Sequence, residues 1–338
     1  MLYPIHVLED SEARVSGMGL ARALSRLLPA RVTIQLGAAS LRRALWSLPV
    51  IEAIASTFVQ AELRIRARPE VARLLAAYER PAPVASRLSS ELDVHLEQVE
   101  DEPTANFEAS SVRAALESTG ASHRLTVPAA PFPAHQQHAA AHAVDGAQVA
   151  GLPARMYEPR LRIGSQERRE ARALCRALAG GNFGGPLAVL APAAGGWSPA
   201  SFARVLERLR EQIGAVGIVV GSLDVPGVRR VVTTDPALVA AMLELAAICI
   251  GDDGDWAHVA AAAGAPTLIV HGHTSPVYSG PLCRHSVSAF TTNGDCERCR
   301  ADQGRRCLAC LDPSKVGELA EELSSRRWPF DRLERMMP

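Results

Sequence analysis

The chain has 338 residues, of which 48% are hydrophobic, so it is long enough to form two domains with separate cores. Basic and acidic residues balance at 36 each and aromatic residues make up only 4%, which argues against a nucleic-acid-binding protein. No stretch approaches the roughly 20 apolar residues of a membrane span, and no secretory signal pattern is visible at the N-terminus, so we expect a cytoplasmic protein.

Strands and helices alternate over the first hundred residues. Hydrophobic patterning predicts strands over residues 3–8, 31–36, 61–65 and 91–96. It predicts helices over residues 11–28, 41–58 and 69–78. This β-α-β order implies a parallel sheet.

Residues 100–165 carry weaker patterns. We expect a helix over residues 110–119. His135, His138 and His142 recur at a spacing that places them on one helix face. A metal site there is one reading, but no carboxylate or cysteine lies beside them to complete it, so we favour a surface-facing stripe.

The second half repeats the alternation more clearly. Strands are predicted over residues 186–191, 216–220, 247–250 and 266–270. Helices are predicted over residues 166–178, 200–213, 236–245, 255–264 and 315–325. We therefore expect an N-terminal domain of residues 1–165 and a C-terminal domain of residues 166–338. We also expect the last helix to pack toward the N-terminal domain.

Polar residues gather where the strands of the C-terminal half end. Asp253 follows a buried strand, His258 lies in the first turn of the next helix, and Thr274 follows the next strand. Ligands of open α/β sheets bind at that edge, where helix N-termini favour anions. Asp253 is either a hydroxyl acceptor or a helix cap, His258 either a ligand contact or a core histidine, and Thr274 either a phosphate contact or a turn cap.

Four of the seven cysteines form a C-x2-C-x7-C-x2-C cluster: Cys296, Cys299, Cys307 and Cys310. This spacing favours tetrahedral thiolate binding of one zinc or iron ion over free thiols or redox disulfides. We expect Cys175 and Cys249, which lie in apolar runs, to be core residues, and Cys283 to lie outside the cluster.

The C-terminal half resembles the heptosyltransferases of glycosyltransferase family 9. That family carries an Asp-Ser/Thr-Gly-x-x-His turn, an alanine-rich helix, Gly-x-Pro, and a strand that ends near Phe-Gly-x-Thr-x-Pro. The matching segments here are residues 253–258, 260–263, 264–266 and 271–276. Residues 31–58 resemble the family's first strand and helix, so residues 1–30 would be an extension.

The resemblance implies the α/β fold called GT-B, with two Rossmann-like domains facing a cleft and a small four-cysteine knuckle near the C-terminus. It implies inverting transfer of heptose from ADP-heptose to a lipopolysaccharide-core or protein acceptor. It further implies peripheral association with the inner membrane, a homo-oligomer, and bound iron as in the branch that modifies autotransporters. The donor contacts it implies are Asp224, Asp253, Gly254, His258 and Thr274.

Three departures bear on activity. The aspartate expected as general base is replaced by Arg43, beside Arg42, and the pair is typical of a solvated helix face. In the family, a lysine that follows the position of Pro192 contacts the donor phosphates. This chain has no lysine there, since its only lysine is Lys315. Asp255 adds a carboxylate where a pyrophosphate would dock.

Two alternatives therefore stay open beside an ADP-heptose enzyme. One is a catalytically degenerate member that acts as a metal-stabilised binding or assembly subunit. The other is a GT-B enzyme for a UDP-sugar. If the chain is active, another carboxylate must serve as base, and Glu9 and Asp10 are the candidates.

Overall fold

The computed structural model describes residues 6–8, 17–37, 39–82, 90–97, 115–119, 122–127, 138–179, 185–233, 235–272, 274–290 and 308–325. The chain divides into two compact units. Unit 1 holds Met1–Arg162 and Val277–Ser279, and unit 2 holds Ile163–Pro276 and Gly280–Pro338. The sequence placed the boundary after residue 165, and the cleft expected between the domains stays a prediction.

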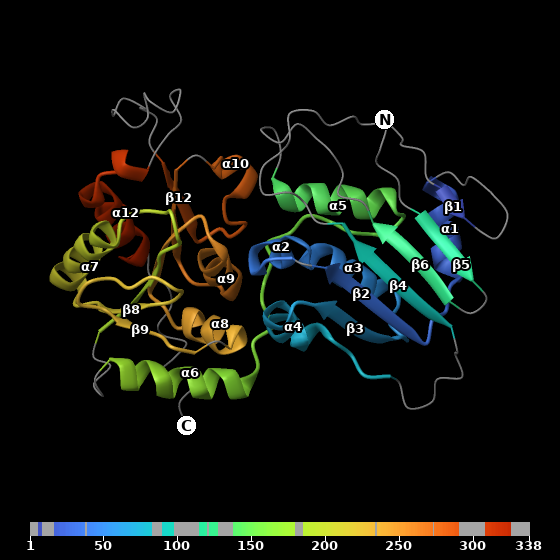
Figure 1. Ribbon diagram of the computed structural model, residues 1–338, viewed down its shortest axis with the longest axis horizontal. Coiled ribbons are helices and arrows are strands. Elements are labelled where there is room, and N and C mark those ends of the chain that lie inside the picture. The colour runs from blue at the N-terminus through green and yellow to red at the C-terminus, as the bar shows by residue number, and fades with distance from the viewer. Residues whose placement is uncertain are drawn as a thin grey trace. The chain divides into compact units, whose positions relative to one another are not determined.

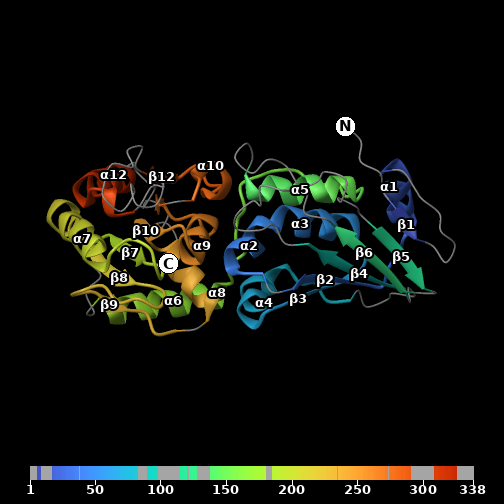
Figure 2. The ribbon, with the colours of Figure 1, turned by 45° about the horizontal axis from the view of Figure 1, so that its top comes forward.

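Unit 1 is built on a six-stranded sheet in the order β1-β5-β6-β4-β2-β3 (Figure 1). Its strands are β1 (His6–Leu8), β2 (Arg31–Gly37), β3 (Glu62–Ala67), β4 (Glu91–Leu96), β5 (Ala115–Thr119) and β6 (Ser122–Val127). Its helices are α1 (Gly17–Arg26), α2 (Leu41–Trp46), α3 (Leu48–Thr57), α4 (Pro69–Leu75) and α5 (Ala139–Val149). Helices α3 and α5 lie side by side over the sheet (Figure 2).

The prediction of a helix over residues 110–119 is wrong, because residues 115–119 form strand β5. This strand pairs antiparallel with β6, a strand that the sequence analysis missed, while the other pairings in the sheet are parallel. Only Gly120 and Ala121 separate the two strands in sequence, a length typical of a hairpin. Cross-strand pairing therefore outweighs the local helix propensity of this segment.

Unit 2 holds a second six-stranded sheet, in the order β12-β11-β10-β7-β8-β9, with every pairing parallel. Its strands are β7 (Leu187–Ala191), β8 (Val216–Val219), β9 (Arg229–Arg230), β10 (Ile248–Asp252), β11 (Thr267–His271) and β12 (Ser286–Phe290). Counted within the unit, the order is 6-5-4-1-2-3, the doubly wound order of nucleotide-binding domains. Strand β12 was missed in the sequence because Ser286 and Ser288 interrupt its apolar residues.

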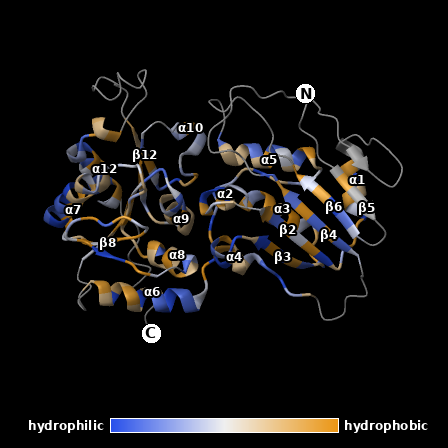
Figure 3. Cartoon of the chain, viewed as in Figure 1, coloured by the Kyte–Doolittle hydropathy of each residue, from blue (hydrophilic) through white to orange (hydrophobic). Residues whose placement is uncertain are grey.

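Helices cover both faces of this second sheet. They are α6 (Ser165–Leu178), α7 (Pro199–Ile213), α8 (Pro236–Glu244), α9 (Asp255–Ala263) and α12 (Pro313–Ser325). All but the first residue of the short helix α10 (Pro276–Ser279) belongs to unit 1. Helix α7 packs beside α12, while α8 packs beside both α6 and α9. Helix α6 is amphipathic: Figure 3 shows both hydrophilic and hydrophobic stretches along it, and its buried residues are Ala171 and Cys175.

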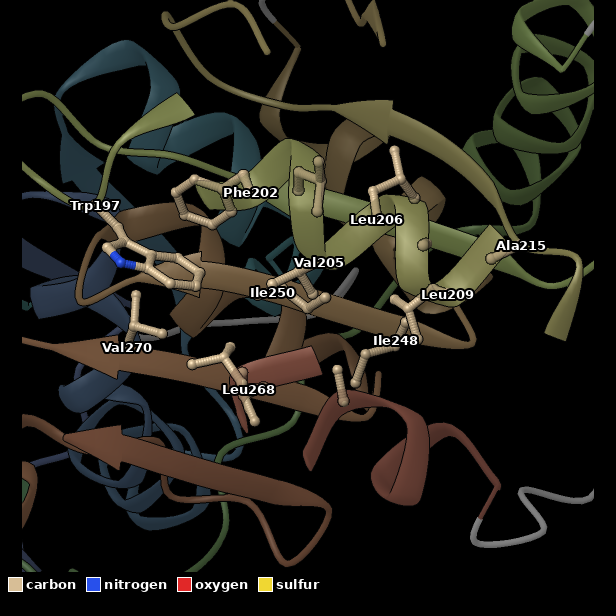
Figure 4. Close-up of a cluster of buried hydrophobic side chains, with 14 of the residues drawn as sticks. Trp197, Phe202, Val205, Leu206, Leu209, Ala215, Ile248, Ile250, Leu268 and Val270 are labelled. Carbon is tan, nitrogen blue, oxygen red and sulfur yellow. The ribbon is translucent and has the colours of Figure 1, made fainter. Parts of the chain in front are cut away.

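The core of unit 2 fills the space between the sheet and the α7–α12 pair. Phe202 is fully buried in α7 and meets Trp197 edge-on, with 5.3 Å between ring centroids (Figure 4). Ile250 and Leu268, on neighbouring strands, contribute fully buried side chains to the same cluster. This core fixes the segment that leads from β7 into α7.

The packing of the last helix toward the N-terminal domain stays a prediction. Helix α12 belongs to unit 2, where Val316, Ala320 and Leu323 join the core. Arg208 of α7 also pairs with Glu321 of α12, with Nη2 and Oε2 3.0 Å apart. Among the residues that the structure describes, no helix is both long and apolar enough to cross a bilayer.

Candidate functional site

The strand order of unit 2 reverses between β7 and β10. From β7 the chain proceeds outward through β8 and β9, and from β10 it proceeds the other way through β11 and β12. In doubly wound sheets, ligands bind beyond the carboxyl ends of the strands at such a reversal. The turn after β7, residues 192–197, and the turn after β10, residues 253–254, are therefore the first places to look for a site.

Asp252, the last residue of β10, links these two turns. Its Oδ2 accepts a hydrogen bond from the N–H of Ala193 at 2.8 Å, and its Oδ1 accepts one from the N–H of Trp197 at 2.7 Å. The carboxylate lies directly against Gly196, where an added Cβ would stand only 2.2 Å from Oδ2. Only glycine at position 196 allows this close approach.

The Asp252 carboxyl has a raised pKa, shifted from 3.8 to about 6. Burial is the main cause, because it disfavours the charged form. The N–H groups of Ala193 and Trp197 oppose the shift, and the neighbouring charge of Asp253 adds to it. The two hydrogen bonds therefore compensate only part of the cost of burying this charge.

Asp253 points into a second polar group, where it meets two histidines. Its Oδ1 lies 2.9 Å from Nε2 of His258, and its Oδ2 lies 3.7 Å from Nδ1 of His271. The side chains of all three are at most 5% exposed. Asp253 and His258, which were each expected to contact the donor, thus contact each other directly across the first turn of α9.

His271 extends this group along the end of β11. Its Nδ1 lies 3.2 Å from Oγ1 of Thr274, and its Nε2 lies 3.1 Å from Oγ of Ser288 on β12. The structure therefore brings together Asp253, His258 and Thr274 through His271, which the sequence analysis noted only as part of a motif. A histidine at the end of a largely apolar strand was the signal available in the sequence.

The remaining predicted donor contacts lie at or near this edge. Gly254 is the N-cap of α9 in an extended conformation, and its N–H donates to the carbonyl of Asp252 at 2.7 Å. The side chain of Trp256, in the first turn of α9, reaches Gly221 just beyond β8. A Cβ added to Gly221 would stand 3.4 Å from Cδ1 of Trp256. Asp224 has a side chain that is 78% exposed and pairs with Arg230 at 2.9 Å.

The positions that the resemblance connects with acceptor chemistry belong to unit 1. Arg43 is in the first turn of α2, where its N–H donates to the capping hydroxyl of Ser40. The Arg42 guanidinium is half-buried over the ring of Trp46, 5.1 Å from the centroid, so the pair is not the fully solvated face that we expected. Glu9 and Asp10 lie outside the described residues.

Of the three histidines in the stripe, the structure describes His138 and His142, and neither is an exposed surface residue. His135 lies outside the described residues. His138 caps α5 by accepting from the N–H of Ala140 at 3.0 Å. His142 is only 4% exposed, and its ring lies 6.0 Å from that of Tyr278. The surface-facing interpretation was wrong because α5 turns this face inward.

Of the four-cysteine cluster, Cys296, Cys299 and Cys307 lie outside the described residues. Cys310 ends a short 3-10 helix, Leu308–Cys310, that begins beside Gly272: an added Cβ there would stand 3.1 Å from Cγ of Leu308. Leu308, two residues before Cys310, therefore lies against the loop that follows His271.

Burial of Cys175 and Cys249 is confirmed. Burial raises the pKa of these thiols to about 11 and about 12, respectively, as expected for unreactive core residues.

Comparison with known proteins connects this edge to a family. A model of glycosyltransferase family 9 (heptosyltransferase) matches residues 232–307, which include β10, α9 and β11. Comparison with curated protein sequences finds no significant match.

Several solved structures share the fold. The family 9 glycosyl transferase of Veillonella parvula DSM 2008 aligns with a TM-score of 0.65 and 12% identity, covering 89% of this chain and 99% of that one. The ADP-heptose lipopolysaccharide heptosyltransferase II of E. coli gives 0.61 and 13%, covering 87% and 98%. The dodecameric iron-containing heptosyltransferase TibC of enterotoxigenic E. coli, in complex with ADP-D-β-D-heptose, gives 0.54 and 14%, covering 88% and 77%.

At these identities the comparisons establish the fold. The chain has the α/β, GT-B-like fold of heptosyltransferase structures, built on two largely parallel sheets, as the sequence predicted.

The raised pKa of Asp252 predicts a specific pH dependence. The native state holds the proton more tightly than the unfolded chain, so this group stabilises the fold fully below about pH 3.8 and loses that contribution as the pH rises through about 6. Relative to Asp252→Asn, the wild-type free energy of unfolding should fall by on the order of 2–3 kcal/mol across this range. Urea unfolding of both proteins between pH 4 and 8 checks this, and a difference that does not change with pH would contradict it.

Proposed function

We propose that the protein is a glycosyltransferase that takes a sugar from a nucleotide donor, with ADP-heptose as the donor and a lipopolysaccharide-core saccharide or a protein as the acceptor. The observation that carries this proposal is the buried contact of Asp253 with His258 at the carboxyl edge of a sheet in nucleotide-binding order. The same two residues lie in the segment matched by the family model. The fold that the chain shares with heptosyltransferase structures also supports a glycosyltransferase function.

In this proposal unit 2 binds the donor. The N-terminal turn of α9 offers backbone N–H groups and a partial positive charge to the diphosphate, and the hydroxyl of Thr274 adds a donor beside it. His258, held by Asp253, would hydrogen-bond the phosphate or the sugar. Gly254 would let a ligand approach the main chain, and Asp224 would face the nucleotide.

The transfer itself would be a direct displacement. The acceptor oxygen forms a bond to the anomeric carbon while the bond from that carbon to the phosphate oxygen breaks, which inverts the configuration and releases ADP. The acceptor hydroxyl gives its proton to a base. Arg43 cannot accept it, because a guanidinium stays protonated at neutral pH. Another carboxylate, with Glu9 and Asp10 as candidates, would take that role.

A second candidate function follows from other contacts. The chain would be a degenerate relative that serves as a binding or assembly subunit. The hydrogen bonds of Asp252 to Ala193 and Trp197 favour it, because they place a carboxylate on the turn that would otherwise be open to donor phosphates. Arg43 at the expected base position favours it as well.

Nucleotide binding separates the two candidates. We expect ADP to bind more tightly than UDP or GDP in isothermal titration. Replacing His258 with alanine should weaken ADP binding by about 10–100-fold, because a charge-assisted or neutral hydrogen bond to the ligand is lost. The matched control is His95→Ala, since His95 is exposed on β4. Absence of binding by all three nucleotides would favour the subunit.

Transfer activity is expected to be weak. A general base contributes about 10²–10⁴ in rate and leaving-group stabilisation about 10²–10³, and the chain lacks the family's residue for each. Heptosyl transfer from ADP-heptose should therefore stay close to background in the wild type and rise in Arg43→Asp, with Arg43→Asn as the charge-neutral control. Robust wild-type transfer that is lost in Asp253→Ala would show that another base operates.

We also propose that the four cysteines hold one zinc or iron ion, with sulfur–metal distances of roughly 2.3 Å for zinc. Elemental analysis of protein purified without chelators should give one metal per chain. Cys310→Ser should lose metal and melt at a lower temperature, because metal binding supplies folding energy, whereas Cys283→Ser should keep the metal. Wild-type protein that contains neither zinc nor iron would exclude the site.

A further inference from the structure

The turn after β7 is the place where a sheet of this order holds phosphate. It is the first strand-to-helix turn of unit 2, it carries Gly195 and Gly196, and it leads into α7 at the N-cap Ser198. In doubly wound domains the N–H groups of this turn and of the following helix face a phosphate. Here the N–H groups of Ala193 and Trp197 instead donate to the two oxygens of Asp252.

The carboxylate fits this turn as a bound anion would. Each oxygen takes one N–H bond, at 2.8 and 2.7 Å, so both acceptors are used in the way that an oxyanion site uses them. The position of a Cβ on Gly196 lies 2.2 Å from Oδ2, 2.3 Å from Cγ and 2.6 Å from Oδ1. The carboxylate therefore covers the face of Gly196 and leaves no room for a second anion there. Asp252 is 3% exposed, so solvent does not compete for these bonds.

Charge reinforces this exclusion. Asp253 is the next residue, and Asp255 stands in the first turn of α9. A phosphate entering the turn would meet these carboxylates as well as the one it must displace, and like charges at short range repel strongly in a poorly solvated setting. Burial is the main cause of the raised pKa of Asp252, and the charge of Asp253 adds to the shift.

We propose that the turn formed by residues 193–197 is an anion-binding site that the protein fills with its own Asp252 carboxylate. The wild-type protein thus excludes phosphate and diphosphate groups from this turn, and removal of the carboxylate creates a phosphate site. A donor diphosphate, if one binds, is held on the α9 and Thr274 side of the edge instead. The inference does not require the proposed function, because it concerns only what occupies the turn.

The test uses the full chain with inorganic phosphate and pyrophosphate as probes. Asp252→Ala empties the turn. Its melting temperature in phosphate-free buffer should lie below that of the wild type, and pyrophosphate should raise it in a saturable way, because a ligand that binds only the folded state stabilises it. Titration should give pyrophosphate affinity at least about tenfold tighter than for the wild type.

Two further variants make the result decisive. Asp255→Asn removes an equal charge at the same edge but leaves the turn filled, so it should gain no phosphate response. Asp252→Ser removes the charge and shortens the side chain, so it opens the turn while keeping one hydroxyl acceptor. It carries the test if the alanine variant does not fold, and it should still bind pyrophosphate more tightly than the wild type.

The inference is overturned if neither Asp252 variant gains affinity, or if Asp255→Asn gains as much as they do. Nucleotide titration of the wild type is independent of this outcome. If the wild type binds ADP but the Asp252 variants gain no pyrophosphate affinity, only the proposal that Asp252 fills the turn is refuted. If the Asp252 variants gain pyrophosphate affinity but the wild type binds no nucleotide, only the proposed donor site is refuted.

Discussion

The C-terminal unit depends on one pair of hydrogen bonds, those from the main chain of the turn after β7 to the carboxylate of Asp252. They join the ends of β7 and β10, the two strands between which the sheet reverses its order. Burial of Trp197 against Phe202 holds one end of the turn in the core, and the carboxylate holds the rest. The shape of the edge is therefore fixed before any ligand arrives, as preorganised sites require.

A second consequence of this arrangement is that the adjacent residues Asp252 and Asp253 have different hydrogen-bond partners. Asp252 faces the turn after β7, while Asp253 faces His258 and His271. Two imidazole rings lie against this buried carboxylate, and its hydrogen bond with His258 offsets part of the cost of burying it. His271 then carries the network on to Thr274 and Ser288, so three strands and one helix are tied by side chains at the edge where the family model matches.

Much of the fold was predictable, because most strands of both sheets carry an apolar or alternating pattern and are separated by helices with apolar faces. Apolar runs such as residues 186–191 and 266–270 are typical of strands in a parallel sheet covered on both faces, and they form β7 and β11. The failures came where burial gives no continuous signal. Strand β5 depends on a hairpin partner, and serine alternates with the apolar residues of β12.

The candidate site was predictable in part for a similar reason. Spacing placed Asp253, His258 and Thr274 near one another, since strand ends and helix starts share an edge. Spacing did not distinguish Asp252 from Asp253, because which way a side chain points at the last residue of a strand depends on the neighbouring turn. It also gave no role to Ser288, which reaches His271 only because β12 pairs with β11.

The contact between Gly196 and Asp252 has a consequence for the history of the chain. Because a side chain at position 196 would occupy the space of the carboxylate, substitutions at these two positions are epistatic: each residue restricts what the other can become. A larger residue at position 196 is accessible only after Asp252 has been lost, and an aspartate at position 252 can arise only where position 196 is already glycine. The order of mutational steps at this edge is therefore constrained, and a lineage that has acquired both residues leaves that state most readily through position 252.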